Sequence, residues 1–128
     1  MREILTVFGK TDGSSTTGDF SLNGDLLYSA VTTIRIPAGV KVKIWAKRIS
    51  GKAVTVIVNY APDITVASPS WKSVDSEYLV SDGEIVLEKR RPLVLRGLTG
   101  KEGFKLSWSQ GTAGISNVSF DIEFTDEE

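Results

Sequence analysis

Hydrophobic and polar residues alternate with a period of two along most of the chain, as they do in strands with one buried face. The clearest segment spans 40–47, where valine, isoleucine and alanine alternate with lysines and Trp45. No stretch of ten residues follows the helical period of 3.6. The pattern predicts eight strands, at 2–8, 28–36, 40–47, 53–60, 84–88, 92–96, 104–108 and 118–125.

Glycine, proline, serine and aspartate separate the predicted strands, and no helix lies between them, which is typical of an antiparallel β-sandwich or small barrel. Eight strands in 128 residues favour a jelly roll, and we expect residues 1–128 to form one all-β domain. The three-residue link 50–52 predicts a hairpin between the strands on either side of it. Residues 9–19 and 61–75 are expected to be irregular loops.

Composition then removes several classes of function. The chain has no cysteine and no histidine, so it has no disulfides, no thiolate chemistry, and neither the usual general base nor the commonest metal ligand. The net charge of −1 argues against a protein that coats nucleic acid. The apolar runs are too short to span a membrane, and the first residues do not resemble a signal peptide, so we expect a soluble protein.

The motif-like segments do not meet the requirements of a catalytic or metal site. Residues 9–11 (Gly-Lys-Thr) match the end of a phosphate-binding loop, but the first glycine of that motif and the helix after it are missing. The acidic segments 12–19 and 82–84 offer too few oxygen ligands for a calcium loop. Without histidine, the serines lack their usual activating base. We therefore expect no enzymatic activity, no cofactor and no metal ion.

The charged residues form two runs of opposite sign. Five cations and no acid lie between Lys41 and Lys52, and five acids and no base lie between Asp121 and Glu128. Such runs are usually solvated strand faces and tails. The alternative is that the two runs attract each other between identical copies, which would set the register of an assembly.

The aromatic residues suggest a recognition surface. Trp45 lies on the lysine-bearing face of its strand, so its ring should be covered by lysine stems or by a partner. Trp108 aligns with the apolar face of its strand and is expected in the core. A carbohydrate-binding module would instead use exposed aromatics as a platform, for which Trp45, Trp71 and Tyr78 are the candidates.

The predicted architecture, the lack of catalytic residues and the segments 34–39 (Ile-Arg-Ile-Pro-Ala-Gly) and 116–124 (Ser-Asn-Val-Ser-Phe-Asp-Ile-Glu-Phe) resemble small jelly-roll virion proteins, such as capsid-decoration and single-jelly-roll coat proteins. The same features are compatible with trimeric jelly-roll domains of the tumour-necrosis-factor or C1q type. The resemblance implies a homo-oligomer, with a trimer as one arrangement, that stabilises a particle such as a capsid lattice. It carries over no individual residue.

These observations predict a non-enzymatic structural or assembly protein, located in a virion if it is viral, with no membrane partner and no direct contact with nucleic acid. The shortage of thermolabile side chains suggests a heat-tolerant source. The alternative is a glycan-binding β-sandwich module. The loop 9–19 is a further candidate contact, and the residues predicted at the interface are Lys43, Trp45, Lys47, Trp71, Asp126, Glu127 and Glu128.

Overall fold

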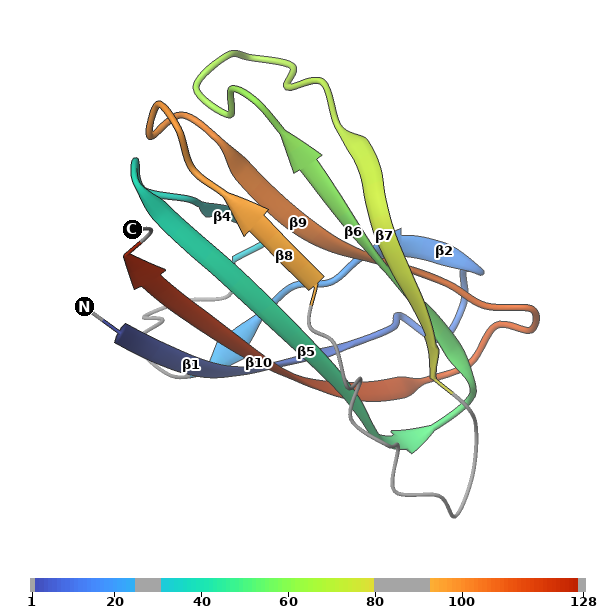
Figure 1. Cartoon of the computed structure of the whole chain (residues 1–128). Coiled ribbons are helices and arrows are strands. Elements are labelled where there is room, and N and C mark those ends of the chain that lie inside the picture. Colours follow the sequence, from blue (N-terminus) through green and yellow to red (C-terminus); the bar gives the residue numbers. More distant parts are fainter. Residues whose placement is uncertain (1, 25–30, 80–92, 127–128) are drawn as a thin grey trace.

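The computed structural model describes residues 2–24, 31–79 and 93–126, which form two antiparallel sheets packed face to face (Figure 1). Sheet A has the order β3-β1-β10-β5-β8, and its strands are β1 (Arg2–Lys10), β3 (Asn23–Gly24), β5 (Val40–Gly51), β8 (Leu93–Arg96) and β10 (Ser116–Asp126). Sheet B has the order β2-β9-β6-β7, with β4 also paired to β9. Its strands are β2 (Thr17–Asp19), β4 (Thr33–Arg35), β6 (Val54–Ala61), β7 (Lys72–Leu79) and β9 (Gly103–Ser109). The fold is therefore the predicted all-β sandwich.

The described residues contain no helix, so none of them forms a helix long and apolar enough to cross a membrane. The longest pairings place β10 between β1 and β5, where Ile122 lies opposite Leu5 on one side and opposite Ile44 on the other. Because alternate side chains on all three strands point to the same face, one face of sheet A is continuous hydrocarbon.

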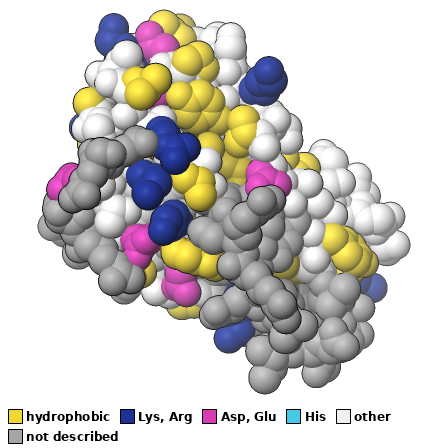
Figure 2. All heavy atoms as spheres, viewed as in Figure 1, with side chains coloured by type: hydrophobic (Ala, Val, Ile, Leu, Met, Phe, Trp, Pro, Cys, Tyr) yellow, Lys and Arg dark blue, Asp and Glu magenta, His cyan; other side chains and the backbone are white. Residues whose placement is uncertain are grey.

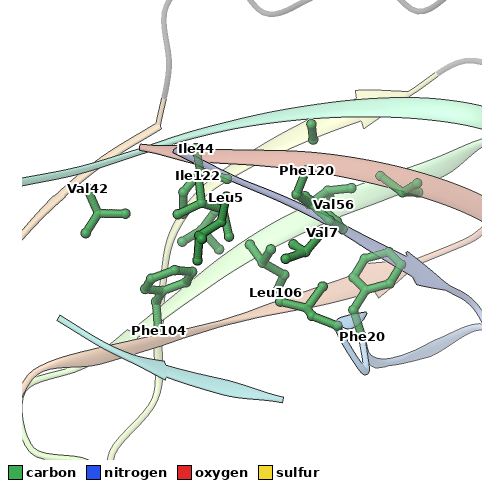
Figure 3. Packing of buried hydrophobic residues seen from close by; sticks show 14 of the residues in the cluster. Leu5, Val7, Phe20, Val42, Ile44, Val56, Phe104, Leu106, Phe120 and Ile122 are labelled. Atoms are coloured by element: carbon green, nitrogen blue, oxygen red, sulfur yellow. The ribbon is translucent and has the colours of Figure 1, made fainter. Parts of the chain in front are cut away.

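The core lies between the two sheets, and most of it consists of the alternating apolar residues of the predicted strands, whereas Phe20, Leu22 and Leu79 lie outside every predicted strand (Figure 3). Phe20 packs against aromatic rings of both sheets, with ring centroids 5.3 Å from Trp108 and 5.2 Å from Phe120 in tilted and edge-on arrangements. Trp108 is buried, as predicted. The other large buried side chains include Leu5, Val7, Val42, Ile44 and Ile122 from sheet A and Val54, Val56, Val58, Phe104 and Leu106 from sheet B.

The predicted hairpin at 50–52 is wrong. β5 belongs to sheet A and β6 to sheet B, so the link between them crosses from one layer to the other. The backbone N–H of Lys52 donates to the carbonyl of Ile115 at 3.0 Å, and Gly51 has φ of +96° with its Cα packed closely on the same segment. The link is thus hydrogen-bonded to the start of β10. The buried valines of β5 and β6 face the core from opposite sheets.

Two predicted loops contain strands. The segment 61–75 includes the first half of β7, and the segment 9–19 ends in β2. β7 was hard to predict because it lies at the edge of sheet B and most of its described side chains are exposed, so it lacks a regular apolar alternation. Of the predicted strand 28–36, β4 covers 33–35 and Val31 forms an isolated bridge with Leu22, while residues 28–30 lie outside the described residues. The predicted strand 84–88 and residue 92 also lie outside them.

Candidate functional site

The outer face of sheet A carries the basic strand that the sequence singled out. Lys43, Trp45 and Lys47 alternate with buried residues of β5 and point away from the core, as predicted. The ring of Trp45 is half-buried, and in the register of the sheet Trp45 lies opposite Asp121. Figure 2 shows Lys and Arg side chains beside hydrophobic ones on one face of the molecule, with Asp and Glu side chains close by.

The two runs of opposite charge lie next to each other within one chain, because β5 and β10 are paired strands. Lys43 Nζ is 4.0 Å from Glu123 Oε1, and the Glu123 residue is only 6% exposed. The hydroxyl of Thr6 donates to Asp121 Oδ1 at 2.9 Å. The basic and acidic runs therefore attract each other within one chain, between β5 and β10. Asp126 is exposed at the end of β10, while Glu127 and Glu128 lie outside the described residues.

Apolar side chains share this outer face with the charges. The register places Ile4, Glu123, Lys43 and Val94 in one row across four strands, and the two apolar residues of that row are about half exposed. Phe8 also points outward from β1, four residues after Ile4, and is about half exposed. The face is thus a mixture of hydrocarbon and paired charge.

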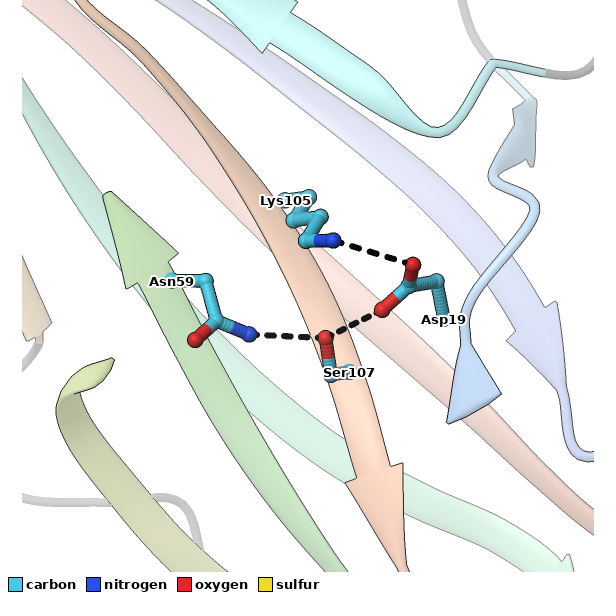
Figure 4. Close-up of polar contacts among 4 residues, drawn as sticks. All are labelled: Asp19, Asn59, Lys105 and Ser107. Atoms are coloured by element: carbon cyan, nitrogen blue, oxygen red, sulfur yellow. Dashed lines mark hydrogen bonds and ion pairs between the residues drawn. The ribbon is translucent and has the colours of Figure 1, made fainter. Parts of the chain in front are cut away.

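The outer face of sheet B carries a chain of polar contacts (Figure 4). Asn59 Nδ2 donates to Ser107 Oγ at 2.7 Å, and Ser107 Oγ donates to Asp19 Oδ1 at 2.6 Å. Lys105 Nζ then contacts Asp19 Oδ2 at 3.1 Å. Because the hydroxyl of Ser107 both donates and accepts within this network, the arrangement braces β2, β9 and β6 against one another.

The three candidate aromatics do not form one platform. Trp71, just before β7, is half-buried, and Lys105 Nζ lies 4.9 Å from its ring centroid. Tyr78 projects from the outer face of sheet B and is 63% exposed. Trp45 lies on the outer face of sheet A, on the opposite side of the sandwich. A glycan platform built from all three is therefore wrong.

The carboxylate of Glu102, a residue that the sequence did not single out, organises the turn between β8 and β9. The backbone N–H groups of Leu98, Thr99 and Gly100 each donate to it at 3.0 Å. Burial by itself would raise the pKa of Glu102, but these donors and its own N–H outweigh burial and lower the pKa to about 2. Gly100 has φ of +83°, a conformation that favours glycine.

This turn, residues 97–102, displays Leu98, which is 77% exposed. The turn is tied to the start of β5, because Gly39 N–H donates to the Gly97 carbonyl and Gly97 N–H donates to the Val40 carbonyl, both at 2.9 Å. Arg35 Nη1 donates to the carbonyl of Gly100 at 3.0 Å. The apolar side chain is therefore presented on a braced turn.

A groove of about 560 Å³ lies near the other end of β5; we call it the distal groove. Its apolar lining is Phe8, Ile49, Trp108 and Val118, and its polar lining includes Lys10, Asp12, Asp19 and Asn23. Ile49 faces outward from β5 on the same side as Lys43, Trp45 and Lys47, and it lies at a bulge, since Arg48 and Ser50 pair with consecutive residues of β10 and Ile49 has no partner in that register. Within the described part of the chain, the buried Nε1 of Trp108 has no hydrogen-bond partner.

A second groove, of about 770 Å³, lies beside Tyr78; we call it the Tyr78 groove. Lys52, Thr55 and Thr112 line it together with Gln110. Gln110 Nε2 donates to the Gly114 carbonyl and to Ser116 Oγ, both at 3.0 Å, but its buried Oε1 receives no hydrogen bond from the described residues. The groove thus combines an exposed aromatic ring with several polar groups.

The described residues contain no group of three or more acidic, histidine or cysteine side chains placed to hold a metal ion. Asp12, considered above as a calcium ligand, instead closes its own turn by accepting the N–H groups of Ser14 and Ser15 at 2.9 Å and 2.8 Å. These bonds lower the pKa of Asp12. The carboxylate of Asp12 thus serves to stabilise its own loop.

Leu98, Ile49 and Glu102 were missed by the sequence analysis, because Leu98 and Glu102 lie in a turn, about which strand alternation says nothing, and Ile49 lies beyond the predicted strand 40–47. The signal available was an isolated leucine between glycines in the segment 97–100, where no strand face can bury it. Comparison with known proteins adds no further candidate. No family model matches the chain, and neither a curated protein nor a solved structure is similar to it.

Proposed function

We propose that this chain is a non-enzymatic structural protein that assembles with copies of itself, as jelly-roll proteins of virion shells do. The observation that carries the proposal is the set of large apolar side chains that a rigid sandwich leaves in water. Phe8 and Ile49 line the distal groove together, while Ile4 and Val94 lie in one row of sheet A with Glu123 and Lys43 between them. Contiguous apolar surface such as the lining of the distal groove is typical of protein–protein contacts, whereas isolated exposed residues need no explanation.

The strand pairings support a jelly roll. They are nested: β1 pairs with β10, β2 and β4 pair with β9, β5 pairs with β8, and β6 pairs with β7. A long antiparallel ribbon rolled into two sheets produces this order, as in the eight-stranded double-sheet folds. Location in a virion stays a prediction that rests on the resemblance.

The polar groups support a structural role. Glu102, Asp19 and Ser107 are each hydrogen-bonded inside the chain to several partners. Polar groups that are hydrogen-bonded within the chain make a scaffold rigid. A rigid scaffold loses less conformational entropy when it binds a neighbour.

Static light scattering of the purified chain at increasing concentration tests the proposal. We expect a molar mass above that of the monomer which grows with concentration, and which sulfate increases, because excluded salts favour burial of apolar surface. The monomer mass at every concentration, with or without sulfate, would overturn the proposal.

A glycan-binding function remains as a second candidate, and the Tyr78 groove favours it. Sugar rings stack on exposed aromatic rings, and Lys52, Thr55 and Thr112 supply polar groups for sugar hydroxyls in the same groove. Calorimetric titration with an oligosaccharide panel tests it. We expect a sugar that binds the parent protein and the Trp71→Ala variant but not Tyr78→Ala, whereas the absence of heat across the panel rejects this candidate.

A further inference from the structure

We propose that copies of this chain associate head to tail, with Leu98 of one copy inserted into the distal groove of the next. This inference rests on the self-association proposed above and names the two surfaces that meet. The projecting residue and the groove are both present in every copy, so each subunit offers one of each.

The first surface is the turn 97–102. A side chain that is 77% exposed gains most when a partner buries it, and Leu98 is the most exposed of the large apolar residues in the described ranges. The Glu102 carboxylate fixes the backbone of the turn through three N–H groups. Little conformational freedom of the backbone is therefore lost on binding.

The second surface is the distal groove, whose apolar lining is set by strand geometry. Ile49 projects outward from β5 at the bulge, and Phe8 projects outward from β1. Its volume of about 560 Å³ leaves room for a leucine side chain together with part of the turn that carries it. Burying Leu98 there would cover hydrocarbon on both partners.

The two surfaces cannot meet within one chain. Backbone hydrogen bonds join Gly97 to Gly39 and Val40 at the start of β5, while Ile49 lies near the end of that strand, which Figure 1 shows as long and extended. Val40 and Ile49 are nine residue steps apart along the strand, which is about 30 Å. The contact must therefore form between copies. Because it joins two different patches, it generates a ring if the rotation closes and a filament if it does not.

Charge supports this orientation. Arg35 and Lys101 are exposed beside Leu98, and Arg35 is held there by its bond to Gly100. The groove lining holds Asp12, Asp19 and Lys10. Because Asp19 is already paired with Lys105 at 3.1 Å, the exposed carboxylate of Asp12 is the charge that the groove offers to Arg35 or Lys101. Opposite charges around an apolar contact set its register and its rate of formation more than its strength.

Disulfide trapping tests the geometry, because the natural chain has no cysteine. We mix the single variants Leu98→Cys and Ile49→Cys under mild oxidation. We expect a covalent heterodimer, and a ladder of multimers from the double variant. Val66→Cys is the matched control for Leu98→Cys, because Val66 is also exposed and its loop is bonded to the same turn through Ile64 and Lys101. It should cross-link to Ile49→Cys much less.

Light scattering of variants without cysteine completes the test. Leu98→Ser should weaken self-association about tenfold or more, the loss expected for one buried leucine, while Val66→Ser should leave it unchanged. If the parent chain associates but Leu98→Ser does so equally well and no Leu98–Ile49 disulfide forms, this inference is wrong and the proposed function stands. If the parent chain stays monomeric at every concentration, the proposed function fails and this inference fails with it.

Discussion

The backbone N–H of Leu98 donates to the carboxylate of Glu102 at 3.0 Å, so a nearly fully buried charge and the most exposed large apolar side chain in the described residues belong to one turn. Burying a carboxylate costs free energy unless donors compensate it. Here they do, and the braced turn holds Leu98 in an exposed position. The proposed contact of this turn with a second copy rests on that relationship.

Glu102→Gln should loosen the turn, because the neutral amide accepts the three N–H groups more weakly and brings two donors into a site made for an acceptor. We expect the free energy of unfolding at neutral pH to fall by about 2 kcal/mol. Amide hydrogen exchange at Leu98, Thr99 and Gly100 should become faster. Glu3→Gln, at an exposed position, is the control and should change neither quantity.

Acid should destabilise the protein through the same carboxylate. Because the pKa of Glu102 is about 2 in the folded chain against an ordinary value of 4.5, the unfolded chain binds more protons between these values. Its contribution to stability is complete above pH 4.5 and is lost as the pH falls from 4.5 toward 2. Urea unfolding at several pH values measures this. The parent chain should lose more stability than Glu102→Gln in that window, and parallel curves would contradict the assignment.

Gly18 packs directly on the ring of Trp108, and a Cβ added there would lie 2.5 Å from Cη2 and Cζ2. The ring cannot retreat easily, because it packs against Phe20 in the core. Gly18→Ala should therefore lower the free energy of unfolding by about 1–3 kcal/mol and alter tryptophan fluorescence. Gly111→Ala, where nothing lies within 4 Å of the added Cβ, is the control. Equal stability of the two variants would refute the close packing.

The Asp19 network predicts a coupled loss. Asp19→Ala removes the acceptor of both Lys105 and Ser107, and we expect a fall of about 1 kcal/mol in the free energy of unfolding. Lys105→Met keeps most of the stem but removes the charge near Trp71. A double-mutant cycle of these two substitutions should show a coupling of a few tenths of a kcal/mol, as is typical for exposed pairs. Strict additivity would mean that the contact contributes nothing.

The sequence predicted those parts of the fold in which one face of a strand is buried. The alternation in 40–47, 104–108 and 118–125 identified both the strands and their inward faces, and it placed Trp45 on the outside. It failed at β7, an edge strand without a regular apolar alternation, because an exposed strand imposes no period on its residues.

The remaining differences arise from contacts between segments that are distant in sequence. A short link such as 50–52 is compatible with a hairpin within one sheet and with a crossing between the two sheets. In this chain it crosses, and the Lys52 N–H bonds to the carbonyl of Ile115, which is distant in sequence. The charged runs were expected to be solvated faces and tails, or alternatively to attract each other between copies, but the pairing of β5 with β10 places them side by side within the chain. Glu102 acquires its role only when the turn before it folds back onto its carboxylate.

The midpoint temperature of thermal unfolding, measured against protein concentration, tests the central claim most directly. If native copies associate, mass action stabilises the folded state, and the midpoint should rise as the concentration of the parent chain increases. Leu98→Ser should show a smaller rise. A midpoint of the parent chain that does not change with concentration would contradict the view that this sandwich acts by binding its own copies.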